Sequence, residues 1–156
     1  MLSEEVVKYA SSLGFELSMM EVIKTQCLPF DLNSINWKGI DAIVFTSENA
    51  VNCFFNNAPK SSKETFLEEK KIISTSGKTA EALIEKGFSP PITGKNAEEL
   101  SQKIIFSGTI KSVLHICGDF TIDIIKRNLE NRLIKYKALT FYNTIAVENK
   151  KPGGGF

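Results

Sequence analysis

Short apolar runs alternate with amphipathic segments along most of this chain. The runs are typical of buried strands and cover residues 41–45, 71–74, 112–116 and 137–142. Between and beside them the pattern predicts helices over 49–57, 79–86, 96–106 and 120–131. This alternation favours right-handed βαβ units and a parallel sheet that is covered on both faces. The sequence therefore predicts an α/β fold with a flavodoxin-like, doubly wound parallel sheet flanked by helices.

Further elements are predicted near the N-terminus and at the sheet edge. Ser3 and two acids favour a helix that stops near Gly14, and an apolar strand is predicted over 17–23. Residues 89–91 (SPP) are typical of an edge element, and Asn96 is expected to cap the helix that follows it. Trp37 and the phenylalanines are expected to pack in the core.

Composition limits the classes of function. Nineteen basic residues against 18 acidic ones give a net charge of +1, which does not support a broad nucleic-acid-binding surface. No apolar run is long enough for a membrane span, and the acidic start does not resemble a secretory signal. Cys27, Cys53 and Cys117 are widely spaced and include no CxxC motif, so we expect reduced cysteines and a cytoplasmic location.

Small polar residues follow three of the predicted strands. They occur at 46–49 (TSEN), 74–79 (STSGKT) and 117–119 (CGD), each before a helix. Such strand exits meet at one edge of an open α/β sheet, where helix N-termini offer free N–H groups to anions. These residue types are also the common helix caps, so the pattern fits either a carboxylate or phosphate site or simple capping.

Sharper motifs are incomplete. Residues 76–79 (SGKT) end like a phosphate-binding loop, but Ile72 occupies the place of its first glycine, so nucleotide hydrolysis is not indicated. His115 and Cys117 share a strand face, and packing explains this pair better than a metal site or a catalytic triad. Tyr142 closes the last strand, either as a packed tyrosine or as a phenol that donates a proton.

Five segments together resemble the uroporphyrinogen-III synthase family of tetrapyrrole (haem) biosynthesis. Residues 43–51 (IVFTSENAV) are similar to the family's I-F-T-S-x-x-A-V, and Thr79, Ala80, Leu83 and Gly87 to its T-A-x-x-L-x-x-x-G. Residues 94–100 (GKNAEEL), 114–118 (LHICG) and 141–144 (FYNT) follow in family order. The resemblance covers about residues 13–147. The family glycine before the Thr-Ala pair is Ser76 here, with Gly77 one place later.

The resemblance implies a bilobal lyase with its site in the cleft between the lobes. Such an enzyme closes linear hydroxymethylbilane into uroporphyrinogen III, inverts the last pyrrole ring and releases water, without a cofactor or metal. Tyr142 matches the tyrosine expected to help the hydroxyl leave. The expected substrate contacts, carried over by position, are Thr46, Ser47, Asn49, Ser76, Thr79 and Gly118.

The same resemblance predicts how the chain is divided. Residues 35–138 are expected to form one complete lobe, 1–34 part of the first lobe with a linker strand, and 139–156 the return linker strand and a frayed tail. Two interpretations stay open: a synthase, or a non-catalytic α/β module that binds an anionic small molecule. The expected partner is the linear tetrapyrrole rather than nucleic acid or membrane, with self-association possible through the incomplete lobe.

Overall fold

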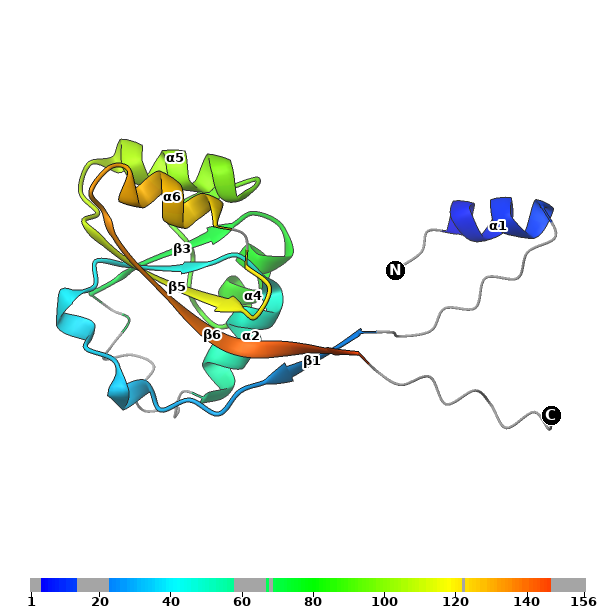
Figure 1. Ribbon diagram of the computed structural model, residues 1–156, viewed down its shortest axis with the longest axis horizontal. Coiled ribbons are helices and arrows are strands. Elements are labelled where there is room, and N and C mark those ends of the chain that lie inside the picture. The colour runs from blue at the N-terminus through cyan, green and yellow to red at the C-terminus, as the bar shows by residue number, and fades with distance from the viewer. Residues whose placement is uncertain (1–3, 14–22, 58–66, 68, 122, 147–156) are drawn as a thin grey trace. The chain divides into compact units, whose positions relative to one another are not determined.

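The computed structural model describes residues 4–13, 23–57, 67, 69–121 and 123–146 (Figure 1). The chain divides into two compact units, one that combines residues 1–24 with 145–156 and one that spans Thr25–Thr144. In the first unit, helix α1 (Glu4–Ser12) carries two acids in its first turn, and it confirms the predicted helix. Of the strand predicted over 17–23, only Ile23 lies within the described residues.

A six-stranded sheet with the order β1-β6-β5-β2-β3-β4 forms the centre of the Thr25–Thr144 unit. Strands β2 to β6 pair in parallel, whereas β1 runs opposite to β6 (Figure 1). The strands are β1 (Ile23–Cys27), β2 (Ala42–Phe45), β3 (Lys71–Thr75), β4 (Ile92–Gly94), β5 (Ser112–Gly118) and β6 (Lys135–Ala146). The predicted doubly wound α/β class is confirmed.

The strand order determines where a ligand site can form. When the five parallel strands β2 to β6 are numbered 1 to 5 along the chain, they lie in the order 3-2-1-4-5 across the sheet. The order in flavodoxin is 2-1-3-4-5, so the two folds differ in the place of the third strand. The order reverses between β2 and β5. In open α/β sheets, ligands bind outside the carboxyl ends of the strands at such a reversal.

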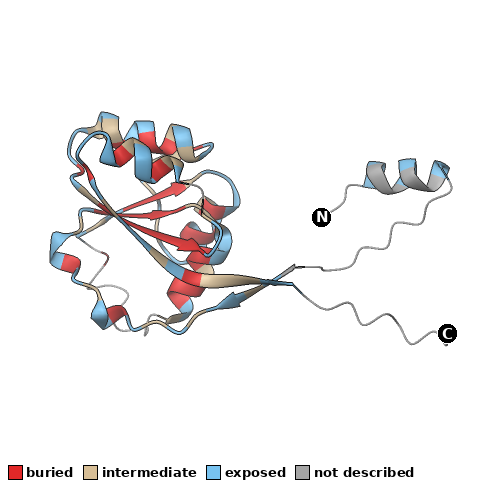
Figure 2. Cartoon of the chain, viewed as in Figure 1, coloured by how far each residue is buried: buried red, intermediate tan, exposed pale blue. Residues whose placement is uncertain are grey.

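Helices cover both faces of the sheet and bury alternate strand residues. Helices α2 (Glu48–Asn57) and α4 (Lys78–Glu85) pack on one face, and α5 (Ala97–Ser107) and α6 (Ile124–Glu130) on the other. Figure 2 shows the central strands as almost entirely buried. The first face contributes Ile43, Phe45, Ile72, Leu114 and Ile116, and the second contributes Ala42, Val44, Ile73 and Val113. Burial on both faces explains why these strands are continuous apolar runs.

Local interactions set several element boundaries. Helix α5 begins where expected, because the Asn96 side chain accepts a hydrogen bond from the Glu99 N–H at 2.9 Å. The edge strand β4 begins at Ile92, after the prolines that the sequence placed in it, because proline has no N–H to give a strand. Helix α6 is shorter than predicted, since Thr121 donates to the Gly118 carbonyl and holds a turn before it.

Among the described residues, the core prediction holds for Trp37 and for most phenylalanines but not for all, and Phe15, Phe66 and Phe156 lie outside the described residues. Trp37 is buried and begins the 3-10 helix η2 (Trp37–Gly39). Its Nε1 donates to the carbonyl of Leu32 in the preceding 3-10 helix η1 (Leu32–Ser34). Phe106 and Phe120 are instead 93% and 81% exposed, so the prediction is wrong for them. Among the described helices, none has the length and apolar character needed to cross a membrane.

Candidate functional site

A cavity of about 400 Å³ lies at the carboxyl ends of the parallel strands. It includes the reversal point between β2 and β5, and it brings together the three predicted strand exits. Its described lining is Thr46, Ser47, Thr75, Ser76, Lys95, Asn96, Ala97, His115, Cys117, Gly118, Phe120, Thr121, Ile125 and Tyr142. Five of the seven predicted site residues are in this lining: Thr46, Ser47, Ser76, Gly118 and Tyr142.

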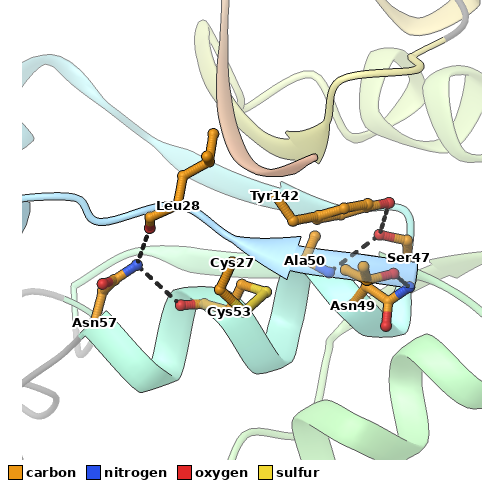
Figure 3. Close-up of a disulfide and its surroundings, with 9 residues drawn as sticks. Cys27, Leu28, Ser47, Asn49, Ala50, Cys53, Asn57 and Tyr142 are labelled. Atoms are coloured by element: carbon orange, nitrogen blue, oxygen red, sulfur yellow. Dashed lines mark hydrogen bonds between the residues drawn. A yellow bond between two sulfur atoms is a disulfide. The ribbon is translucent and has the colours of Figure 1, made fainter. Parts of the chain in front are cut away.

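Ser47 joins a helix start to the last strand. It precedes α2, and its Oγ accepts a hydrogen bond from the Ala50 N–H at 3.2 Å. The same Oγ lies 3.0 Å from the Tyr142 hydroxyl of β6, with either oxygen able to donate (Figure 3). The pair therefore holds a phenol at the cavity wall, beside the N-terminus of α2.

Gly118 makes room for the Tyr142 ring. The two residues are register partners across β5 and β6, next to an irregularity in the pairing. A Cβ atom on residue 118 would lie 2.7 Å from the Tyr142 hydroxyl oxygen and closer still to two ring carbons. A side chain at residue 118 would require the Tyr142 ring to move.

Thr46 is hydrogen-bonded to the buried imidazole of His115. The His115 Nε2 lies 2.8 Å from Thr46 Oγ1, and its Nδ1 lies 2.7 Å from the Tyr136 hydroxyl. Burial lowers the pKa of His115 to about 4, so the ring is neutral at pH 7. Burial also raises the pKa of Tyr136, which keeps its phenol protonated.

The other two predicted contacts lie outside the cavity lining. Thr79 is buried in the first turn of α4. Asn49 is exposed on α2, and its amide donates to Thr25 Oγ1 at 3.1 Å. Between the exit of β3 and α4, Gly77 has φ = 78°, a conformation that favours glycine, so the glycine one place after Ser76 is the residue that makes this turn.

Sequence reasoning missed four lining residues with useful chemistry. Lys95 and Asn96 follow β4, which is a fourth strand exit, and the sequence offered this signal in its GKN segment. Phe120 follows the exit of β5 and leaves an aromatic face exposed at the cavity. His115 was expected only to pack, and its two hydroxyl partners come from distant parts of the chain.

A disulfide near the site corrects the prediction of three reduced cysteines. Cys27 of β1 and Cys53 of α2 are bonded, with their Cα atoms 5.3 Å apart, and Cys117 alone is a free thiol (Figure 3). The prediction is wrong for Cys27 and Cys53 because the fold places residues 26 positions apart side by side. Asn57, one turn after Cys53, donates to the Leu28 carbonyl and strengthens this attachment.

The lining favours an anionic ligand that accepts hydrogen bonds. Hydroxyl groups dominate it, Lys95 is the one cation among its described members, and α2 and α5 both begin at its wall. Within the described part of the chain, no three His, Cys, Asp or Glu side chains gather in a way that could hold a metal ion. The arrangement can bind carboxylates and offer a phenolic proton.

A family model described as uroporphyrinogen-III synthase HemD matches residues 4–153. The chain belongs to this family. The resemblance to uroporphyrinogen-III synthase that the sequence indicated is therefore confirmed, and the cavity with its Ser47–Tyr142 pair belongs to a member of this family. Among curated protein sequences, none matches the chain.

Solved uroporphyrinogen III synthases share the fold. A mutant synthase from the extremely thermophilic bacterium Thermus thermophilus aligns with a TM-score of 0.67 at 17% identity, over 92% of this chain and 59% of that one. The synthetase from Helicobacter pylori aligns with a TM-score of 0.63 at 20% identity, over 85% of this chain and 57% of that one. The chain thus spans less than two thirds of the length of these synthases.

Proposed function

We propose that this chain binds hydroxymethylbilane at the strand-exit cavity and takes part in its closure to uroporphyrinogen III. The observation that carries the proposal is the Tyr142 hydroxyl at the cavity wall, 3.0 Å from Ser47 Oγ and directly over Gly118. The substrate class suits the lining, because a linear tetrapyrrole with eight carboxylates presents hydrogen-bond acceptors to hydroxyl and N–H donors.

The proposed reaction requires a proton on the oxygen of the terminal hydroxyl of the bilane. The terminal hydroxyl of the bilane leaves as water when a phenol protonates it, and we assign this role to Tyr142. For the type III isomer, the carbon that lost the hydroxyl bonds to the already substituted α-carbon of the last pyrrole, and the bond from that α-carbon to its bridging methylene breaks. The released methylene bonds to the free α-carbon of the same ring, which gives up a proton, so the net change is the loss of one water. If Ser47 donates to the phenol oxygen, the phenol proton is free to point into the cavity. The remainder of catalysis is positioning of the two chain ends.

Product analysis tests this proposal. Hydroxymethylbilane is supplied to the purified protein, the porphyrinogens are oxidised, and the porphyrin isomers are separated by chromatography. The proposal predicts the type III isomer in excess over a protein-free control. Type I alone would contradict it.

The second candidate is a non-catalytic α/β module that binds an anionic small molecule. The observation that favours it is coverage, because the chain spans 57% to 60% of the solved synthases. A fluorescence titration with uroporphyrin III separates the candidates when it is combined with product analysis. Saturable binding without type III product supports the module.

A third possibility is that two copies of the chain complete one site between them. Sedimentation at the concentration of the activity assay tests this possibility. A dimer that yields type III product supports it, and a monomer at every concentration removes it.

A further inference from the structure

His115 connects the cavity to a strand on its far side. It lies on β5, is 1% exposed, and is the single histidine of the chain. Its Nε2 meets Thr46 at the exit of β2, and its Nδ1 meets Tyr136 near the start of β6. Because β5 lies between β2 and β6, the three side chains form one hydrogen-bonded row across the sheet. Thr46 and His115 line the cavity and Tyr136 does not.

A neutral imidazole allows this row only two directions. One ring nitrogen donates and the other accepts, and each hydroxyl has one proton to give. Either Tyr136 donates to Nδ1 and Nε2–H donates to Thr46, or Thr46 donates to Nε2 and Nδ1–H donates to Tyr136. The two directions differ in what Thr46 offers to the cavity, since the first leaves its proton free and the second leaves only its lone pairs.

The acidity of the two hydroxyls favours the first direction. A phenol is a far stronger hydrogen-bond donor than an aliphatic alcohol, so the imidazole lone pair is better paired with Tyr136. Each direction leaves one hydroxyl proton without an acceptor among the described residues, and the first direction leaves that of the weaker donor, Thr46, which lines the cavity. Nδ1 is therefore the accepting nitrogen and Nε2 carries the proton.

We propose that Tyr136 and His115 are positioning residues that fix the Thr46 hydroxyl as a hydrogen-bond donor directed into the cavity. A fixed donor selects an acceptor, such as a carboxylate, over an amide N–H or an ammonium group. With respect to the ligand the inference rests on the proposed function, because the bilane carboxylates supply the acceptor. The direction of the row itself does not depend on any ligand.

The first test reads the tautomer in the free protein. Because the chain contains one histidine, the nitrogen-15 NMR spectrum of uniformly labelled protein at pH 7 contains the signals of a single imidazole, and they need no residue assignment. We expect a protonated Nε2 and an unprotonated Nδ1. The opposite tautomer, or an imidazolium ring, would overturn the proposal whether or not the protein is active.

The second test is a double-mutant cycle on the affinity for uroporphyrin III, followed by porphyrin fluorescence. Thr46→Val removes the donor, and Tyr136→Phe removes the group that orients it. We expect each to weaken binding about fivefold or more, and the double variant to bind within about twofold of Thr46→Val. Independent losses that multiply in the double variant would overturn the positioning role.

Matched controls separate this role from general damage to the fold. Thr46→Ser keeps the hydroxyl and should bind more tightly than Thr46→Val, while Tyr9→Phe removes the hydroxyl of an exposed tyrosine on α1 and should have no effect. Thermal unfolding of every variant identifies any that fail to fold. Failure of uroporphyrin III to bind the wild-type protein would contradict the proposed function alone, because the tautomer decides the direction of the row.

Discussion

The Tyr142 hydroxyl lies 3.0 Å from Ser47 Oγ, so the last strand of the sheet is hydrogen-bonded to the start of α2. Ser47 also caps that helix through the Ala50 N–H. One serine therefore sets both the beginning of α2 and the position of the phenol. The proposed proton donor is held by two elements that are far apart in the sequence.

Replacing Tyr142 by phenylalanine should abolish most of the type III product without unfolding the protein. The variant loses the proposed acid, and general acid catalysis typically accelerates a reaction about 10²- to 10⁴-fold. We therefore expect the rate of type III formation to fall at least about 100-fold. Its stability should fall by about 1 kcal/mol, because Ser47 loses one partner. Isomer analysis and urea unfolding measure the two effects. Tyr9→Phe is the matched control, and an equal loss of product in that variant would speak against a specific role for Tyr142.

Gly118→Ala should displace the Tyr142 ring. The added methyl group would overlap the ring, and overpacking of this kind costs about 1–3 kcal/mol. We expect a lower free energy of unfolding and the loss of type III product together. Gly39→Ala is the control, since a Cβ there meets no atom within 4 Å. Equal stability of the two variants would show that the close approach at residue 118 is not a constraint.

Reduction of the Cys27–Cys53 disulfide should destabilise the protein. The bridge joins residues 26 positions apart, and closing a loop of this length contributes about 3 kcal/mol through the unfolded chain. Thiol titration of the unfolded protein should find one thiol before treatment with dithiothreitol and three after it. The reductant should lower Tm in the wild type and in Cys117→Ser, and have no effect on Cys53→Ser. A reductant-independent Tm in the wild type would contradict the bridge.

Stability should fall with pH below the ordinary pKa of histidine. Burial lowers the pKa of His115 to about 4, from 6.5, so between these values the unfolded chain binds a proton that the folded protein does not. The resulting stability is fully present above pH 6.5 and is lost as pH falls toward 4. We expect a loss of about 2 kcal/mol between pH 7.5 and pH 5 from this group. Urea unfolding measures it, and His115→Gln should remove this part of the pH dependence. An identical pH dependence in both proteins would rule out the assignment to His115.

Features encoded by neighbouring residues could be predicted from the sequence. The buried strand 42–45 and the cap at Asn96 each depend on a few adjacent side chains, and both occur as expected. The meeting of strand exits at one cavity also follows from local patterns, because parallel strands share an edge.

Contacts between distant residues could not be predicted in this way. The pairing of Cys27 with Cys53 and the two partners of His115 depend on strand order and register, which no local pattern determines. Phe120 is exposed for a related reason. It follows the predicted helical pattern, but the turn held by Thr121 places it at the cavity before the helix begins.

The bridge between β1 and α2 has a consequence for how the chain responds to proteolysis. Residues 27–53 form a covalent ring that includes the central strand β2. After a single cut anywhere within 28–52, the disulfide therefore still joins the two fragments. They migrate as one band in a denaturing gel until a reductant is added. A cut outside the ring separates the fragments at once.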